Sequence, residues 1–284
     1  MTIENIVLDR DKRGIAALRP HLPADYCDRA ARVVLDNPGT AIIVTGFYIV
    51  SAGATETDGP PGAVAIGDAL QSIGYEVVYV TDRHTLDVME GTAGPDSSVV
   101  EFPIVGVEES RSFAKELLSE IAPSVIIGIE RCGLTSEGLY RNMRGVDISE
   151  YNAKTDYLFE SGVPSVGIGD GGNEIGLGNL ADIIPSVPSL VRLPCVTTTS
   201  ALVIASVSNW GGYGLVAAMS RAKGQNLLPS IETEQTLVKR NVELGAVDGP
   251  SGEAVPMVDG FTLEENSQAL RELHDLLADE GVGA

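Results

Sequence analysis

Short apolar segments alternate along this chain with longer segments that have an amphipathic pattern. The short segments are rich in β-branched residues and nearly continuous in their apolar character, which is typical of strands buried on both faces. The longer segments repeat their apolar positions at helical spacing, and one of them opens with two prolines, as a first helical turn permits. The alternation predicts an α/β fold: a largely parallel, doubly wound (Rossmann-like) sheet with helices on both faces.

We expect strands over residues 41–45, 76–81, 98–102, 125–129, 165–168 and 202–207. We expect helices over residues 60–73, 108–121, 211–222, 232–244 and 262–278. We predict three parts: an N-terminal helical extension over 1–37, an α/β catalytic domain over 38–250, and a C-terminal helical segment over 251–284 packed on the same domain. A chain of 284 residues is long enough to bury a substantial core in this way.

Charge and composition narrow the classes of partner. The formal net charge is −21, which disfavours nucleic acid because nucleic acid binding needs clustered Lys and Arg. No apolar run approaches the roughly 20 residues that span a bilayer, and the first residues mix charges where a signal peptide needs an apolar stretch. The three cysteines are far apart and indicate neither a disulfide framework nor a zinc site. We therefore expect a cytoplasmic protein with a small-molecule ligand, and a homo-oligomer is compatible with this.

The proportions of lysine, arginine and acidic residues suggest the kind of organism from which the chain comes. Five lysines accompany 14 arginines, against 40 acidic residues. Acid-rich, lysine-poor surfaces suit molar salt, because screening over about 3 Å then removes self-repulsion. The hypothesis is a halophilic source with an acidic proteome, and the alternative is an ordinary acidic protein.

Polar clusters follow four of the expected strands. They are residues 51–62, Glu130 with Arg131, the glycine loop Gly167-Ile-Gly-Asp-Gly-Gly-Asn-Glu174, and Ser208 with Asn209. Because ligands of open α/β sheets bind beyond the carboxyl ends of the strands, we expect these clusters to form one site.

The glycine loop matches the G-x-G-x-x-G pattern of dinucleotide-binding proteins literally. That interpretation fails, because Asp170 would face the pyrophosphate and no acid follows about 20 residues later to hold a ribose. The loop instead offers Asp170, Asn173 and Glu174 to a ligand. If a helix starts near Gly171, the amides of Gly171 and Gly172 would attract a carboxylate or oxyanion. The alternative is that Asp170 is only a helix N-cap.

Other polar residues are candidates for substrate binding, each with a structural alternative. Asp58 would cap the helix that follows it and Thr57 would bind an anion, and the alternative is that the loop is only a turn. The guanidinium groups near Glu130 either capture a carboxylate or form surface ion pairs. The full set of predicted substrate-binding residues is Asp58, Thr57, Glu130, Arg131, Arg144, Gly171, Gly172, Thr197, Thr198 and Asn209. Motifs of P-loop NTPases, nucleophile-elbow hydrolases and zincins do not occur.

Four stretches resemble the D-glutamate cyclase family, in the C-terminal domain that was long of unknown function. They are Gly169-Asp-Gly-Gly-Asn-Glu-Ile-Gly176, Thr55-Glu-Thr-Asp-Gly-Pro-Pro-Gly62, Tyr140-Arg-Asn-Met-Arg-Gly145 and Ala205-Ser-Val-Ser-Asn-Trp-Gly211. The resemblance covers roughly residues 37–250. It implies a hydro-lyase that converts D-glutamate to 5-oxo-D-proline and water by acid–base-assisted intramolecular amide formation.

The residues suit that chemistry. As a hypothesis, Asp170 is the base toward the amine and Glu174 the acid toward the leaving oxygen, although the two roles could be exchanged. Asn173 and the loop amides would stabilise the oxyanion. Arg131 or Arg144 would hold the α-carboxylate, and Thr197 and Thr198 would complete the pocket. We expect no cofactor. The alternatives are a divalent-metal-dependent lyase acting on another small carboxylate, in which Asp170 and Glu174 with Asp58 bind Mg²⁺ or Mn²⁺, and an amino-acid-binding protein without catalysis.

Overall fold

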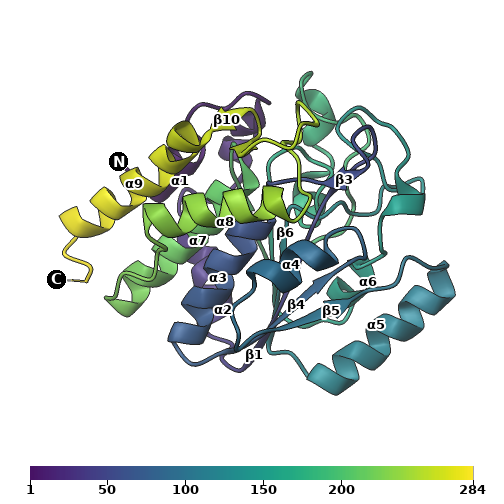
Figure 1. The fold of residues 1–284 in the computed structure, drawn as a ribbon, viewed down its shortest axis with the longest axis horizontal. Helices are drawn as coiled ribbons and strands as arrows, with labels where there is room; N and C mark the ends of the chain where they lie inside the picture. The colour runs from purple at the N-terminus through teal and green to yellow at the C-terminus, as the bar shows by residue number, and fades with distance from the viewer. Residues whose placement is uncertain (284) are drawn as a thin grey trace.

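Six parallel strands form the central sheet of the computed structural model, which describes residues 1–283 (Figure 1). The strands lie in the order β5-β4-β1-β6-β7-β8, and every neighbouring pair is parallel. The chain builds outward from β1 to β5, then returns to the centre and builds the other half from β6 to β8. The order therefore reverses between β1 and β6, the kind of position at which ligands bind in such sheets. The strands are β1 (Thr40–Thr45), β4 (Glu76–Thr81), β5 (Ser98–Glu101), β6 (Val125–Ile129), β7 (Ser165–Gly169) and β8 (Ala201–Ile204).

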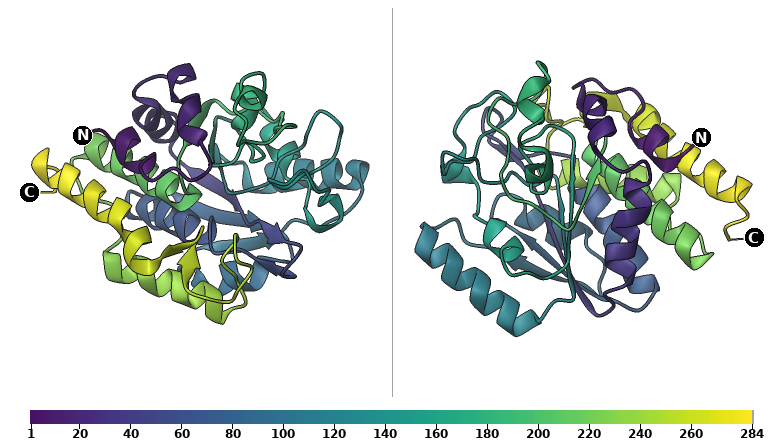
Figure 2. Two further views of the ribbon diagram at one scale, coloured as in Figure 1. Left: turned by 90° about the horizontal axis from the view of Figure 1, so that it is seen from above. Right: turned by 180° about the vertical axis from the view of Figure 1, so that it is seen from behind.

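Helices cover both faces of the sheet, which confirms the predicted doubly wound fold. Alternate residues of a strand point to opposite faces, so Ala41 and Ile43 belong to the larger core cluster with α2, α3 and α7. Ile42 and Val44 belong to a second cluster with α5 and α6. Figure 2 shows α5 standing apart on its own side of the sheet. The longer helices are α2 (Tyr26–Leu35), α3 (Pro60–Ser72), α5 (Val107–Ile121), α7 (Ser208–Lys223), α8 (Ile231–Glu243) and α9 (Leu263–Asp279).

Shorter elements connect the main ones. Two antiparallel hairpins pair β2 with β3 and β9 with β10. The short helices are α1 (Ile3–Val7), α4 (Leu86–Thr92) and α6 (Asp156–Phe159). The 3₁₀ turns are η1 (Ile15–His21), η2 (Ser149–Tyr151), η3 (Leu177–Leu180) and η4 (Ile184–Ser186). The hairpin strands are β2 (Tyr48–Ile49), β3 (Ala54–Thr55), β9 (Met257–Val258) and β10 (Phe261–Thr262).

The two ends of the chain lie side by side on the larger face. Helices α1 and α9 both contact α7, and they contact one another (Figure 1). Their buried residues, such as Ile3 and Leu273, belong to the same core cluster as β1 and β6. The last residue of the predicted C-terminal segment, Ala284, lies outside the described residues. Within residues 1–283, no helix is both long and apolar enough to cross a lipid bilayer.

The elements differ from the predicted ranges mainly after β7. Strand β8 ends at Ile204 and helix α7 begins at Ser208, whereas we predicted a strand to residue 207 and a helix from 211. Asp58 explains the early start, because its carboxylate accepts hydrogen bonds from the amides of Ser208 (2.9 Å) and Asn209 (2.8 Å). Because the capping residue lies 150 positions away in the chain, the residues around Ser208 contain no signal for the start of a helix.

Candidate active site

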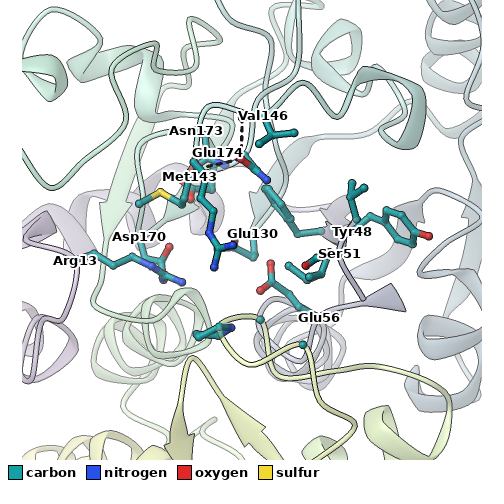
Figure 3. Close-up of a pocket in the computed structure, with 18 of the residues that line it drawn as sticks. Arg13, Tyr48, Ser51, Glu56, Glu130, Met143, Val146, Asp170, Asn173 and Glu174 are labelled. Carbon is teal, nitrogen blue, oxygen red and sulfur yellow. Dashed lines mark hydrogen bonds and ion pairs between the residues drawn. The ribbon is translucent and has the colours of Figure 1, made fainter. Parts of the chain in front are cut away.

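A cavity of about 560 Å³ opens beyond the carboxyl ends of β1, β6 and β7. Phe47 follows β1, Glu130 follows β6 and Asp170 follows β7, and all three line it. The cavity thus lies where the strand order reverses, as the sheet topology favours. Figure 3 shows side chains from these separate segments directed toward the same space.

Four acidic side chains line the cavity: Glu56, Glu130, Asp170 and Glu174. Each is at most 5% exposed, so none of them is a solvated surface charge. The Ser208 hydroxyl donates a hydrogen bond of 2.5 Å to the Glu130 carboxylate. Glu130 also has φ of +43°, a left-handed conformation that costs free energy in a residue other than glycine and is often found at functional sites.

Burial and mutual repulsion alter the protonation of this cluster. Burial, followed by the charge of Glu174, raises the pKa of Glu130 well above its ordinary value. Burial, followed by the charge of Asp259, does the same to the pKa of Glu56. Burial also raises the pKa of Glu174, although hydrogen bonds from backbone amides oppose the shift. The cluster therefore retains protons at a pH where exposed carboxylic acids have lost them.

Arg13 brings a positive charge to the acidic cluster from the N-terminal segment. Its guanidinium forms an ion pair with Asp170 and a two-pronged pair with Asp259, in which both N–O distances are 2.7 Å. Burial disfavours the charged form, but the surrounding carboxylates, led by Asp259, raise the pKa of Arg13 above its ordinary value. The cation is therefore fixed between a residue after β7 and a residue of the β9–β10 turn.

The glycine loop is shaped by contacts within the protein. A Cβ atom on Gly167 would lie 2.6 Å from both the Gly176 Cα and the Ile175 carbonyl oxygen, so the close approach is backbone to backbone. No helix begins near Gly171, and the next helical turn is η3. The amides of Gly171 and Gly172 donate to the Glu174 carboxylate at 3.1 and 2.8 Å. The predicted anion-binding amides are thus occupied by the protein's own carboxylate, and neither glycine lines the cavity.

Asn173 has an amide group without a partner. The residue is 1% exposed and lines the cavity, yet neither its Nδ2 nor its Oδ1 atom has a hydrogen-bond partner in the described structure. A buried polar group without partners costs about 1–3 kcal/mol. An amide left in this state is available to a polar atom of a ligand.

Arg144 is the other guanidinium of the cavity wall. It is exposed, and the ion pairs within residues 1–283 do not include it. Its backbone amide is held by the Asn142 side chain at 3.0 Å. Unlike Arg13, Arg144 keeps its full hydrogen-bonding capacity for a carboxylate.

Asp58, Asn209 and Thr57 lie beside the cavity but do not line it. Asp58 caps the first turn of α7, as described above, and the Asn209 Oδ1 atom accepts from the amides of Gly59 (3.0 Å) and Gly62 (2.8 Å) at the start of α3. The Thr57 hydroxyl donates to the Met257 carbonyl at 2.6 Å. These three residues join the starts of two helices and the C-terminal hairpin. Asp58 caps α7 and not the helix that follows it, α3, because the free amides at the start of α7 lie beside its carboxylate.

Arg131, Thr197 and Thr198 also lie outside the cavity wall. Arg131 is 1% exposed and forms an ion pair of 2.6 Å with Asp82. The Thr197 hydroxyl donates to Asp156 at 2.5 Å, and Thr198 is exposed. Of the two arginines proposed to hold the α-carboxylate, only Arg144 is in position to do so.

Sequence reasoning missed three charged residues at or beside the cavity. Glu56 lay within a loop from which only Thr57 and Asp58 were selected. Asp259 forms a hairpin turn with Gly260, and both have positive φ (+52° and +69°), as an Asp-Gly turn predicts. That turn signal was present, but residues 251–284 were predicted only as a C-terminal helical segment. Arg13 had a weaker signal: the Asp11 side chain accepts from the amides of Arg13 (3.0 Å) and Gly14 (2.7 Å), a local turn typical of Asp.

Two groups of carboxylates are close enough to share a metal ion. The oxygens of Glu130, Asp170 and Glu174 lie within 4.8 Å of one another, and those of Asp58, Asp170 and Asp259 do so as well. Arg13 already supplies a cation to Asp170 and Asp259. The first group, with Glu130 and Glu174, is therefore the better candidate for a hard divalent cation.

Comparison with known proteins finds one family whose model matches this chain and one similar human protein. A family described as "D-glutamate cyclase-like, C-terminal" matches residues 3–274. The human protein named "D-glutamate cyclase, mitochondrial" is 29% identical over 317 aligned positions, which cover 95% of this chain. The chain spans half the length of that relative.

Proposed function

Because this chain belongs to the D-glutamate cyclase-like family, we propose that it is a lyase that closes D-glutamate to 5-oxo-D-proline with release of water. The observation that carries the proposal is the cavity itself. It combines buried carboxyl groups of raised pKa with an unpartnered amide, Asn173, and an unpaired guanidinium, Arg144.

Ring closure needs two protons to move in the same direction. The substrate ammonium must lose two protons to become the lactam N–H, and one oxygen of the γ-carboxylate must gain two to leave as water. A carboxylate within the cluster serves as base and a protonated carboxyl serves as acid. Coupled acids with raised pKa values share protons, so that a protonated carboxyl and a carboxylate can lie side by side. Each such role is typically worth roughly 10²–10⁴-fold in rate.

The positions of the side chains suggest how these roles are divided. Arg144 binds the α-carboxylate, and the Asn173 amide donates to the oxyanion that forms at Cδ. Glu174, held by two backbone amides, and Glu130, held by Ser208, face the γ-carboxyl as proton donors. Asp170 faces the amine as the acceptor. Holding the amine against Cδ adds to the rate through orientation.

The decisive assay follows 5-oxoproline by chiral chromatography after the purified chain is incubated with D- or L-glutamate in high salt. The reverse hydrolysis is run in parallel, since the equilibrium can mask one direction. We expect 5-oxo-D-proline from D-glutamate. Binding of D-glutamate without product over hours would support the amino-acid-binding alternative instead.

Substitution of the acids tests the mechanism. Asp170→Asn and Glu174→Gln should each lower kcat by about 10²-fold or more while the protein stays folded. Glu160→Gln serves as the control, because Glu160 is exposed and pairs only with Arg111. Near-normal turnover in both cavity variants would contradict the proposed chemistry.

A metal-dependent version of the same reaction is the second candidate, and the Glu130, Asp170 and Glu174 group favours it. Mg²⁺ or Mn²⁺ on these oxygens would polarise the γ-carboxyl as a Lewis acid. Loss of activity in a chelator and its return with either metal would select this version. Full activity after exhaustive chelation would select the metal-free one.

The cellular location is a separate prediction. The composition favours the cytoplasm, whereas the human relative is named as a mitochondrial protein.

A further inference from the structure

The cavity is larger than glutamate requires. A volume of 560 Å³ corresponds to about 19 water molecules at roughly 30 Å³ each. Glutamate has ten non-hydrogen atoms. A ligand that fills the cavity is therefore nearly twice as large as glutamate.

The additional space has an apolar wall. The segment after β1 supplies Phe47, Ile49 and Val50, and the loop before η2 supplies Met143 and Val146. In Figure 3, Val146 and Glu56 lie on opposite sides of the cavity. The cavity wall thus combines carboxylates with hydrocarbon side chains.

Two residues of this apolar wall are exposed to solvent. Within residues 1–283, five large hydrophobic side chains are exposed, and Val50 (36%) and Val146 (51%) are two of them. Both line this cavity. An apolar group of a ligand placed between them would remove their surface from water.

The charged residues of the cavity also favour a ligand other than free glutamate. Free glutamate brings two carboxylates, but Arg13 is already paired with Asp170 and Asp259. Arg144 then remains for the α-carboxylate, and the residues that line the cavity include no other Arg or Lys to pair with a γ-carboxylate. A γ-amide carries no charge at that position and needs no counter-ion.

Building on the proposed cyclase function, we propose that the preferred substrates are D-glutamyl compounds whose γ-carboxyl forms an amide with an apolar amine. The α-nitrogen forms a bond to Cδ, and the bond from Cδ to the amide nitrogen breaks. The two protons lost by the α-ammonium pass to the departing nitrogen, which leaves as an alkylammonium ion. The products are 5-oxo-D-proline and the amine, and no oxidant, reductant or water is consumed.

Three substrates of graded chemistry test the proposal on the purified chain. D-glutamate, D-glutamine and the γ-n-butylamide of D-glutamate are compared by kcat/KM for 5-oxoproline formation, with the uncatalysed rate subtracted. D-glutamine removes only the γ charge, whereas the butylamide also adds an apolar group. We expect the butylamide to exceed D-glutamine by at least tenfold, since each buried methylene is worth about fourfold, and to exceed D-glutamate as well.

The outcomes separate this inference from the function on which it rests. A butylamide that is no better than either other substrate overturns the inference, while turnover of D-glutamate leaves the cyclase function intact. Absence of 5-oxoproline from all three overturns both.

A pair of matched variants tests whether the preference for the butylamide over D-glutamine depends on the apolar wall. Val146→Asp should lower the ratio of kcat/KM for the butylamide to that for D-glutamine at least fivefold. Val107→Asp is the control, because Val107 is 46% exposed at the start of α5 and does not line the cavity. The control should leave the ratio unchanged, and an equal fall in both variants would overturn the assignment of the wall.

Discussion

Arg13 sets the charge balance of the cavity. It is 23% exposed as a side chain and is paired with Asp170 and Asp259. If Arg13 were removed, Asp170 and Asp259 would lose their counter-ion. The pKa of every carboxyl group in the cavity would then rise, because the positive charge of Arg13 would no longer stabilise the ionised form. A single residue from the N-terminal segment thus controls the protonation of a site that lies mostly on the sheet.

Arg13→Gln is therefore expected to lower kcat by about 10²-fold, and the pH at which activity appears should rise as the carboxylates titrate later. Arg13→Lys should recover part of the loss, because it restores the charge but not the two-pronged geometry. The measurement is kcat and KM between pH 5 and 9. Arg29→Gln is the control, since Arg29 is exposed and pairs only with Asp25. An unchanged pH profile in Arg13→Gln would contradict this role.

At the scale of elements, the glycine loop depends on its contact with its own strand. Gly167 lies in β7, and Gly176, with φ of +101°, packs directly on it. Gly167→Ala would force a methyl group against two backbone atoms that cannot rotate away.

We expect Gly167→Ala to cost about 1–3 kcal/mol of unfolding free energy, as overpacking typically does, and to lower kcat by displacing Glu174. Denaturant unfolding and turnover measure the two effects. Gly94→Ala is the control, because a Cβ atom there meets nothing nearer than 3.7 Å. Wild-type stability in Gly167→Ala would show that the loop can shift at no cost.

The contact between α8 and α9 contains another titrating group, Glu234. It is fully buried and accepts hydrogen bonds from Asn266 and from Ser267 (2.7 Å). Burial raises its pKa from 4.5 to about 7. The folded state therefore holds a proton between these values that the unfolded chain has released, and the free energy of unfolding falls as pH rises through this window.

Glu234→Gln should remove this part of the pH dependence. At about 1.36 kcal/mol per pKa unit, the wild type loses on the order of 3 kcal/mol from this residue between pH 4.5 and 7, and the variant should not. Chemical denaturation across the window measures the difference. Glu232→Gln, an exposed change on the same helix, should keep the wild-type slope. Equal slopes in wild type and Glu234→Gln would contradict the assignment.

For the molecule as a whole, the net charge determines how stability depends on salt concentration. With a net charge of −21, self-repulsion destabilises the compact state at low salt. The melting temperature and the activity should rise with KCl, and most of the gain should come below about 1 M, where the screening length has fallen to about 3 Å. A gain that continues linearly to 4 M would indicate solute exclusion instead. Unchanged stability and activity across the range would refute the halophilic hypothesis.

The sequence predicted the fold well because its strongest signals are local. The strands over 76–81 and 125–129 coincide with β4 and β6, since their apolar runs end at charged or glycine-containing turns. Helix α4 and the two hairpins were not predicted, because segments of two to seven residues carry too few apolar positions to show a period.

The site was only partly predictable, and the reason is physical. Asp170, Asn173, Glu174 and Glu130 were selected for residue type next to a strand end, and Arg144 was selected as a guanidinium group that follows Glu130 in the sequence. All of them line the cavity. Asp58 and Asn209 have the same residue types at similar positions, yet they cap helices, because partners far along the chain decide the direction of a side chain. Arg13 lines the cavity and is paired with Asp259, and both belong to segments outside the sheet, whose positions the strand order does not predict.

The pairing of Arg13 with Asp259 spans 246 positions of the chain, and this separation has a kinetic consequence. During synthesis from the N-terminus, the six sheet strands are complete before the β9–β10 turn is made. Contacts of such long range also form late when a denatured chain refolds. Catalytic competence should therefore lag behind secondary structure in both settings. A refolding experiment that follows circular dichroism and turnover together would show an interval in which the sheet has formed but the protein has no catalytic activity.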